Sequence, residues 1–151
     1  MKKILFIFGT RPEAIKLAPL INLFKKQKML KTKICVTSQH RSLLKKVLNL
    51  FNIRPDYDLN IMTSNQSIEN IIIKISKKLS LILKKINPDL IIVQGDTTSA
   101  MIGGLIASMH KIKVAHIEAG LRTFDNSSPW PEEINRNLIS KISSLNFCPT
   151  K

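Results

Sequence analysis

Four short apolar runs recur along this chain, and segments with helical periodicity lie between them. The runs are rich in β-branched residues and are bounded by turn residues: Ile4–Phe8, Ile34–Thr37, Leu90–Val93 and Val114–Ile117, with a weaker fifth at Leu145–Cys148. Continuous rather than alternating apolarity is typical of strands that are buried on both faces of a parallel sheet. The pattern therefore predicts an α/β fold with a doubly wound parallel sheet.

The segments between the runs predict helices. The longest carries isoleucine and leucine on one face and lysine on the other, and it is bounded by the cap residue Ser67 and by Asn87-Pro88. Shorter patterns fit Pro12–Lys28, Arg41–Phe51, Thr97–Lys111 and Pro131–Ser143. The long irregular stretch of the second half is Ala119–Pro131, and loops of this kind often carry function.

The strongly basic composition raises the hypothesis of a nucleic-acid-binding domain. The net charge of the 151 residues is +14, but the lysines are scattered over helix faces and aromatic residues make up only 5% of the chain. Because platforms for base stacking are not evident, we predict no nucleic-acid partner. A positive field would still attract an anionic substrate.

The N-terminal apolar run is too short for a signal peptide, and charged residues follow it at once. No other run approaches the length of a membrane span, so we expect a single cytoplasmic domain without a membrane partner. Cys35 and Cys148 both lie in strand-like runs, which predicts two buried, reduced thiols. Neither has a second sulfur or a histidine at metal-ligand spacing, so no metal site is expected.

The segment Gly9-Thr-Arg-Pro-Glu13, directly after the first apolar run, is the first candidate for a ligand site. Pro12 suits the first residue of a helix, and the free N–H groups of a helix start attract phosphate. Arg11 and Lys16 would add cationic donors. The competing interpretation is a plain helix start with an i,i+3 pair between Glu13 and Lys16. No Gly-x-Gly-x-x-Gly is present, which argues against a dinucleotide cofactor.

Carboxylates follow the later runs. Asp96 precedes a helix, so an N-cap is its competing role. Glu118 has no helix to cap, and a carboxylate at the carboxyl end of a strand favours a functional role. Glu132 and Glu133 lie in the first turn of a helix, where the positive helix end favours acids. Arg136 could pair with Glu132 at i,i+4.

Three further side chains remain open between two roles. His116, on the strand before Glu118, is either a site residue or, as we expect, a satisfied core histidine. His40 follows the second run and would face either the same sheet edge or a helix start. Trp130 is either a packing anchor or a wall of the site.

Six segments in order give the chain a specific resemblance from Lys3 to Thr150. They are GTRPEAIKLAPL at 9–20, VTSQHR at 36–41, PDYDLNIM at 55–62, QGDTTSA at 94–100, HIEAGLRT at 116–123 and SPWPEEINR at 128–136. With them the chain resembles the N-terminal half of the bacterial non-hydrolysing UDP-N-acetylglucosamine 2-epimerases.

The resemblance implies a Rossmann-like domain equivalent to the N-terminal half of a two-domain GT-B fold. It also implies interconversion of UDP-GlcNAc and UDP-ManNAc by elimination and re-addition of UDP, without a cofactor. Matched by motif, Arg11, Lys16, Asp96 and Glu118 would contact the UDP-sugar. The acid/base carboxylates would be Asp96, Glu118 and Glu132.

The chain also departs from the family pattern. Phe124 stands where relatives usually have glycine, so a positive φ there would reshape the loop. The family's C-terminal, UDP-binding domain is absent from the sequence, so we expect 1–151 to be inactive alone. Either a separately encoded half completes the enzyme, or the chain is a non-catalytic remnant or an interaction module. A family-like homodimer is a further expectation.

Overall fold

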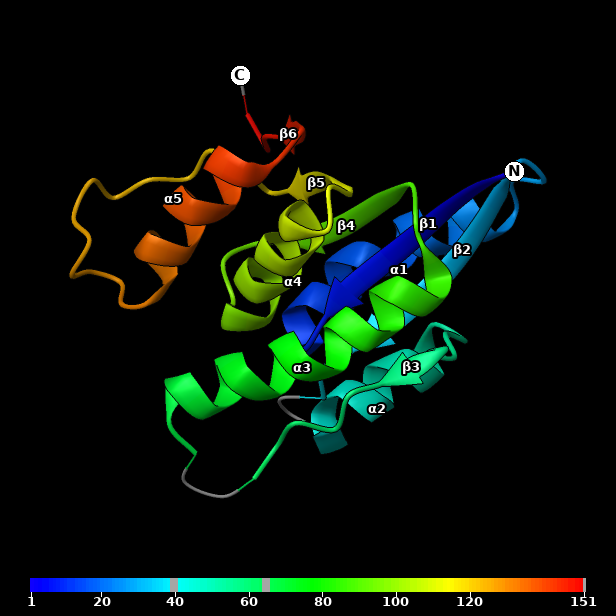
Figure 1. Cartoon of the computed structure of the whole chain (residues 1–151), viewed down its shortest axis with the longest axis horizontal. Coiled ribbons are helices and arrows are strands. Elements are labelled where there is room, and N and C mark those ends of the chain that lie inside the picture. Colours follow the sequence, from blue (N-terminus) through cyan, green and yellow to red (C-terminus); the bar gives the residue numbers. More distant parts are fainter. Residues whose placement is uncertain (39–40, 64–65, 151) are drawn as a thin grey trace.

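One parallel sheet organises the molecule (Figure 1), and the computed structural model describes residues 1–38, 41–63 and 66–150. The strands lie in the order β3-β2-β1-β4-β5-β6, and every neighbouring pair is parallel. Their bounds are β1 Lys2–Phe8, β2 Leu30–Val36, β3 Tyr57–Asp58, β4 Leu90–Gln94, β5 Lys113–Ile117 and β6 Leu145–Phe147. Helices α1 Arg11–Lys25, α2 Arg41–Leu50, α3 Ile68–Ile86, α4 Thr98–Met109 and α5 Glu132–Ile142 connect them. This order is the doubly wound, Rossmann-like arrangement, as predicted.

The alternation of side chains along β1 divides the core into two layers. Phe6 and Phe8 face α1 and α2, where they pack with Leu17 of α1. Leu5 and Ile7 face the other side and join the apolar faces of α3 and α4. Both faces of the central strands are therefore buried, which is why their sequences are continuously apolar.

The apolar runs mark the strand centres but not the strand ends. β2 begins at Leu30, four residues before the run that predicted it, and Lys31 and Lys33 belong to the strand. β3 was not predicted, because two residues are too few to show a period. β6 was predicted, but all of its residues are exposed.

The helix ends follow local capping chemistry. Ser67 caps α3, because its side chain accepts a hydrogen bond from the Asn70 N–H. The same helix ends at Asn87-Pro88, as predicted, and the backbone of Asn87 adopts the left-handed conformation. Cys35 is buried, whereas Cys148 lies after the exposed β6 and is itself exposed, so the prediction of two buried thiols is wrong.

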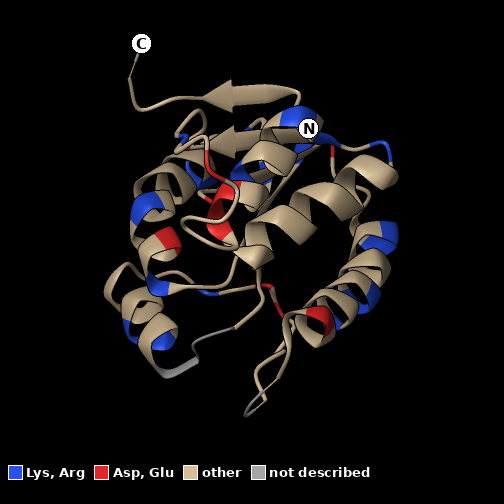
Figure 2. Cartoon of the chain, turned by 90° about the vertical axis from the view of Figure 1, so that its left-hand side faces the viewer, with Lys and Arg blue, Asp and Glu red and all other residues tan. Residues whose placement is uncertain are grey.

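Figure 2 shows the charged segments from the side of α5: lysine and arginine (blue) lie on several helices, and acidic segments (red) are fewer. Among the described residues, no helix combines the length and the apolar content that a membrane crossing requires.

Candidate functional site

A pocket of about 250 Å³ lies at the carboxyl ends of β1, β4 and β5, next to the point where the strand order reverses. Ligands bind at such switch points in open α/β sheets. The pocket is lined by Thr10, Pro12, Glu13, Lys16, Gln94, Gly95, Asp96, Thr97, Glu118, Leu121 and Arg136. The structure therefore brings together three of the predicted site residues, Lys16, Asp96 and Glu118.

Glu118 stands directly after β5 with a left-handed backbone, φ 62°. Its two carboxylate oxygens lie 2.7 Å and 2.5 Å from Nζ of Lys16, on α1. Gln94, the last residue of β4, donates a short hydrogen bond from Nε2 to the same carboxylate. Because no helix needs Glu118 as a cap and its contacts are all to pocket residues, its position suits chemistry better than architecture.

Asp96 is not the N-cap of α4. Thr97 takes that role, since its Oγ1 accepts from the Ala100 N–H. Asp96 is instead fixed by Arg136, whose Nε and Nη2 each lie 2.8 Å from Oδ2. Asn135 adds a 2.8 Å hydrogen bond to the Asp96 carbonyl. The start of α5 thus positions this carboxylate from across the pocket.

Glu13 does not pair with Lys16 but turns back into the protein. It is buried, and Oε2 accepts from the N–H groups of Gly9 (3.0 Å) and Thr10 (2.7 Å). Its Oε1 accepts from Thr97 Oγ1 at 2.8 Å, so one side chain joins the loops after β1 and β4. Burial raises the pKa of Glu13, although these hydrogen bonds oppose the shift. They also occupy two of the N–H groups that the sequence offered to phosphate.

Glu133 holds the loop before α5. It is fully buried, and it accepts from the N–H of Thr123 at 3.1 Å and of Phe124 at 3.4 Å. Arg136 Nη1 lies 3.1 Å from Oε2, so Arg136 bridges Glu133 and Asp96 rather than pairing with Glu132. Burial alone would raise the pKa of Glu133, but the Thr123 N–H and Arg136 outweigh it and the pKa is lowered.

Two predicted site residues lie outside this pocket. Arg11 is the exposed first residue of α1, one position earlier than the predicted helix start. Glu132 is the half-buried first residue of α5. Neither lines the pocket, and neither side chain has a hydrogen bond or ion pair within the described part of the chain. Each lies on an element whose neighbouring residues do reach the pocket.

The structure decides between the alternative roles of His116 and Trp130. His116 is fully buried, and its Nε2 lies 2.7 Å from the Gly95 carbonyl oxygen, which confirms a core position. Its Nδ1 is buried without a hydrogen-bond partner among the described residues, so the prediction of a satisfied histidine holds for one ring nitrogen only. Burial lowers the pKa of His116. Trp130 is 61% exposed and is no packing anchor. His40 lies outside the described residues.

Sequence reasoning missed Arg136, Gln94 and Glu133 as site residues. Arg136 was considered only as a partner of Glu132. The signal that could have found it is its place in the motif 128–136, one helical turn after Glu132 and Glu133. Gln94 and Glu133 also lie in motifs, at 94–100 and 128–136, but their partners could not be found there, because those partners depend on which strands and loops become neighbours.

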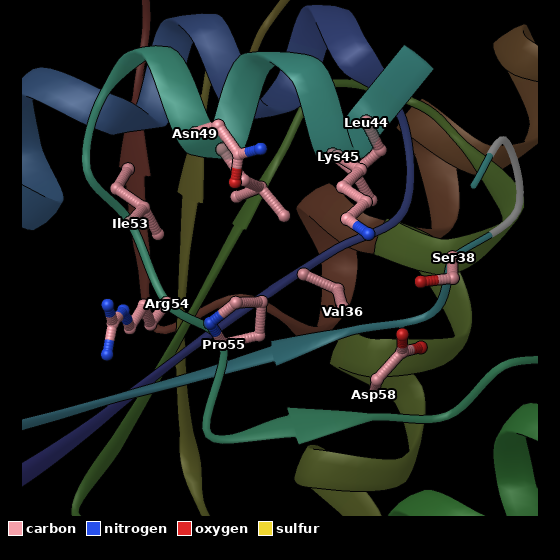
Figure 3. A pocket seen from close by; sticks show the side chains of 10 residues that line it. Val36, Ser38, Leu44, Lys45, Asn49, Ile53, Arg54, Pro55 and Asp58 are labelled. Atoms are coloured by element: carbon pink, nitrogen blue, oxygen red, sulfur yellow. The ribbon is translucent and has the colours of Figure 1, made fainter. Parts of the chain in front are cut away.

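A second pocket, of about 260 Å³, lies between α2 and the ends of β2 and β3 (Figure 3). Val36, Leu44, Ile53 and Pro55 form apolar walls, and Figure 3 shows Ser38 and Asp58 at the opposite end from Arg54. It contains none of the predicted site residues.

Comparison with known proteins gives consistent matches. A family model described as UDP-N-acetylglucosamine 2-epimerase matches residues 22–151. A UDP-N-acetylglucosamine 2-epimerase of Campylobacter jejuni is 48% identical over 150 residues, which is 99% of this chain and 39% of the relative. The corresponding Escherichia coli K12 protein is 49% identical over 149 residues, 40% of its length. The chain spans about two fifths of the length of the curated relatives it matches.

Solved structures give the same picture. The Neisseria meningitidis UDP-GlcNAc 2-epimerase bound to UDP-GlcNAc superposes with a TM-score of 0.95 at 51% identity, over 98% of this chain and 40% of that chain. Acinetobacter baumannii MurG, at 15% identity and a TM-score of 0.71, shares the fold alone, over 97% of this chain and 41% of its own. The sheet is therefore equivalent to the N-terminal half of a two-domain GT-B fold, as predicted.

Proposed function

The chain belongs to the UDP-N-acetylglucosamine 2-epimerase family, and we propose that it forms the N-terminal half of a site that interconverts UDP-GlcNAc and UDP-ManNAc. The observation that carries this proposal is the pocket in which Lys16, Asp96 and Glu118 meet. Acids and cations in one pocket match what the reaction demands.

The hydrogen on C2 of the sugar is not acidic, so inversion there requires the anomeric C–O bond to break. Its electron pair leaves with UDP, which gives C1 oxocarbenium character and acidifies C2–H. A carboxylate then removes the C2 proton, and the C2–H electron pair becomes the C1–C2 double bond of a glycal. For return, UDP oxygen adds to C1 and a proton is delivered to the opposite face of C2. Each assisted proton transfer contributes about 10²–10⁴-fold.

The side chains divide between these demands. Glu118 and Asp96, which follow the neighbouring strands β5 and β4, are the proposed acid/base carboxylates of the pocket. Glu13 also lines the pocket, but its carboxylate is engaged by Gly9, Thr10 and Thr97. Lys16 stands beside Glu118 and would hold the departing diphosphate, because cations stabilise charge that develops on a leaving group. Arg11 and Glu132 would complete the site from its rim, Arg11 as a substrate contact and Glu132 as a third acid/base carboxylate. No metal or organic cofactor is needed for these steps.

We propose that a second, UDP-binding domain forms the wall opposite this pocket, either from a separately encoded half or from another part of the same protein. Homodimers of the kind formed by family members are the expected assembly, and the cytoplasm is the expected compartment. Neither assignment is needed for the chemistry, which depends on the two walls of the site.

The test is a chimera in which residues 1–151 replace the matching region of the C. jejuni relative, assayed with UDP-GlcNAc in D₂O. We expect deuterium at C2 and formation of UDP-ManNAc, and we expect Glu118→Gln in the chimera to abolish both. The intact relative is the positive control, and circular dichroism checks that the chimera folds.

Two outcomes would overturn the proposal. One is a folded chimera that releases no UDP and exchanges no deuterium. The other is undiminished exchange in the Glu118→Gln chimera, which would remove Glu118 from the mechanism. If the chimera does not fold, NMR of residues 1–151 replaces it. Addition of UDP-GlcNAc should then shift the amide signals around Lys16 and Glu118, and unchanged signals would count against the proposal.

A further inference from the structure

Lysine side chains gather at the amino-terminal edge of the sheet, at the opposite ends of the strands from the candidate site. They line a hollow of about 170 Å³. The lining residues, here called the lysine pocket, are Lys3, Lys31, Lys33, Tyr57, Lys85 and Ile86. Since the pocket shares no residue with the candidate site, the inference below is independent of the proposed function.

The strand register explains why the lysines converge. β1 and β2 are parallel, and Lys3 is the direct partner of Lys31. Side chains two residues apart share a face, so Lys31 and Lys33 lie on the same face as Cys35. That face is the one covered by α3.

The apolar layer beneath α3 ends where the helix ends. Leu79 and Leu83 of α3 are buried against the sheet, but the helix stops at Ile86. Beyond that point the aliphatic parts of lysine side chains cover this face of the sheet. The last turn of α3 adds Lys85 from the helix side. Lysine is tolerated here because its stem can cover apolar surface while its ammonium group reaches water.

Only part of this positive charge is compensated. Lys33 forms a short ion pair with Asp56, and Lys3 Nζ donates to the Ile86 carbonyl at 3.0 Å. The side-chain ammonium groups of Lys31 and Lys85 have no hydrogen bond or ion pair within the described residues. The nearby Asp89 is already engaged, because it binds Lys2 Nζ and the Lys3 N–H at 2.8 Å each.

The net positive charge around the lysine pocket favours an anionic ligand. The negative end of α3 amounts to about half a charge, and the lining lysines together have one carboxylate partner. Like charges on neighbouring strands are destabilising, so a bound anion would relieve a repulsion that is built into the fold. Two ammonium groups fixed by Asp56 and Ile86 preorganise the walls, which lowers the entropic cost of binding.

We propose that the lysine pocket binds a phosphoryl oxyanion. Lys31 and Lys85 would donate to it as free cations, and the Tyr57 hydroxyl would add a neutral donor. The hollow has the volume of about six water molecules at about 30 Å³ each, which leaves room for a single phosphate group. A nucleotide could enter only through its phosphate, with the nucleoside left outside.

The experiment measures thermal unfolding of residues 1–151 in low salt during titration with sodium phosphate, with sodium chloride at matched ionic strength as the control. At a phosphate concentration about tenfold above Kd, the melting temperature should rise by about 3–5 °C more than in chloride. In ¹H–¹⁵N spectra, the amide signals of Lys31, Tyr57 and Lys85 should shift. Equal effects of phosphate and chloride, with no local shifts, would overturn the proposal.

Two matched variants separate the pocket from the overall charge. Lys31→Gln/Lys85→Gln removes the two free cations and should lose at least half of the phosphate effect. The same variant should be at least as stable as the parent without phosphate, because repulsion is removed. Lys46→Gln/Lys77→Gln removes the same charge from exposed positions elsewhere and should keep the effect. Equal losses in both variants would mean that net charge alone acts, which contradicts a site.

UDP is the third probe, and it distinguishes the source of the phosphoryl group. If UDP shifts the amide signals of Tyr57 and Lys85, the lysine pocket also binds phosphate that is carried by a nucleotide. If UDP shifts only the amide signals around Lys16 and Glu118, the ligand of the lysine pocket is free phosphate.

Discussion

Lys16 and Glu118 are separated by 102 residues in the chain, yet Lys16 Nζ lies within 2.7 Å of both Glu118 carboxylate oxygens. The pair joins α1 to the end of β5 across β4, which contributes Gln94 to the same carboxylate. One acid therefore gathers groups from three parallel βα connections. Its surroundings suggest a set of measurements on activity and stability.

Glu118→Gln should separate function from stability. The side chains of Lys16 and Glu118 are 50% and 28% exposed, and partly exposed ion pairs contribute about 0–1 kcal/mol. The free energy of unfolding in urea should therefore change by less than about 1 kcal/mol, while isotope exchange in the chimera is lost. A stability loss above about 2 kcal/mol would instead identify Glu118 as a structural residue.

Gly9→Ala should destabilise the protein strongly. A Cβ at Gly9 would lie 2.1 Å from Thr37 Oγ1 and 2.6 Å from Ser99 Oγ, both buried behind the loop. Overpacking of this kind costs about 1–3 kcal/mol, measurable as a lower midpoint of urea unfolding. A Thr37→Ala/Ser99→Ala background removes the two oxygen clashes and leaves only the Ser99 Cβ at 3.2 Å, so the cost of Gly9→Ala should fall there. An unchanged cost would refute the steric explanation.

Phe124→Gly should stabilise the protein. Phe124 occupies the left-handed region, φ 63°, and its side chain is 93% exposed, so little packing offsets the backbone strain. The strain costs about 1–2 kcal/mol, and the greater freedom of glycine in the unfolded chain removes part of the gain. We expect a net rise of about 0.5–1 kcal/mol. Phe124→Ala keeps the strain and is the control; an equal gain there would assign the effect to the exposed ring.

The two thiols should react at very different rates. Cys35 is buried, and burial raises its pKa to about 12, so almost no thiolate exists at neutral pH. Cys148 is exposed. Ellman's reagent should therefore modify one thiol per native chain and two in guanidinium chloride, and Cys148→Ser should remove the fast phase. A fast native reaction in Cys148→Ser would show that the strand around Cys35 opens readily.

Glu13→Gln should change the pH dependence of stability. The folded pKa of Glu13 lies above its ordinary value of 4.5 because the side chain is buried. Its contribution to stability is therefore fully present below pH 4.5 and is lost as the pH rises through the folded pKa, at about 1.4 kcal/mol per unit of pKa difference. Glutamine does not titrate, so the parent should lose stability relative to Glu13→Gln as the pH rises above 4.5 in urea titrations. A relative gain with rising pH would contradict the assignment.

The pattern of apolar runs was sufficient for the doubly wound sheet, because strands buried on both faces must be continuously apolar. It did not predict where the strands begin and end. Lys31 and Lys33 belong to the backbone hydrogen-bond ladder of β2, but their side chains are polar and so do not extend the apolar run. The sequence also singled out Lys16, Asp96 and Glu118 as site residues. It did not identify the partners of Asp96, for which an N-cap was the competing role and Arg136 is the observed contact.

The sequence by itself determined the alternation of strands and helices, the family motifs and the strand ends at which acids and cations would stand. These depend on local periodicity and on residue type, which the chain carries without folding. Only the tertiary structure decided which charge pairs with which. Arg136 is nearer in sequence to Glu132 than to Asp96, but the packing of α5 beside the β4–α4 loop brings Asp96 within 2.8 Å. Partners 40 residues apart are chosen by strand order, and no local pattern encodes that choice.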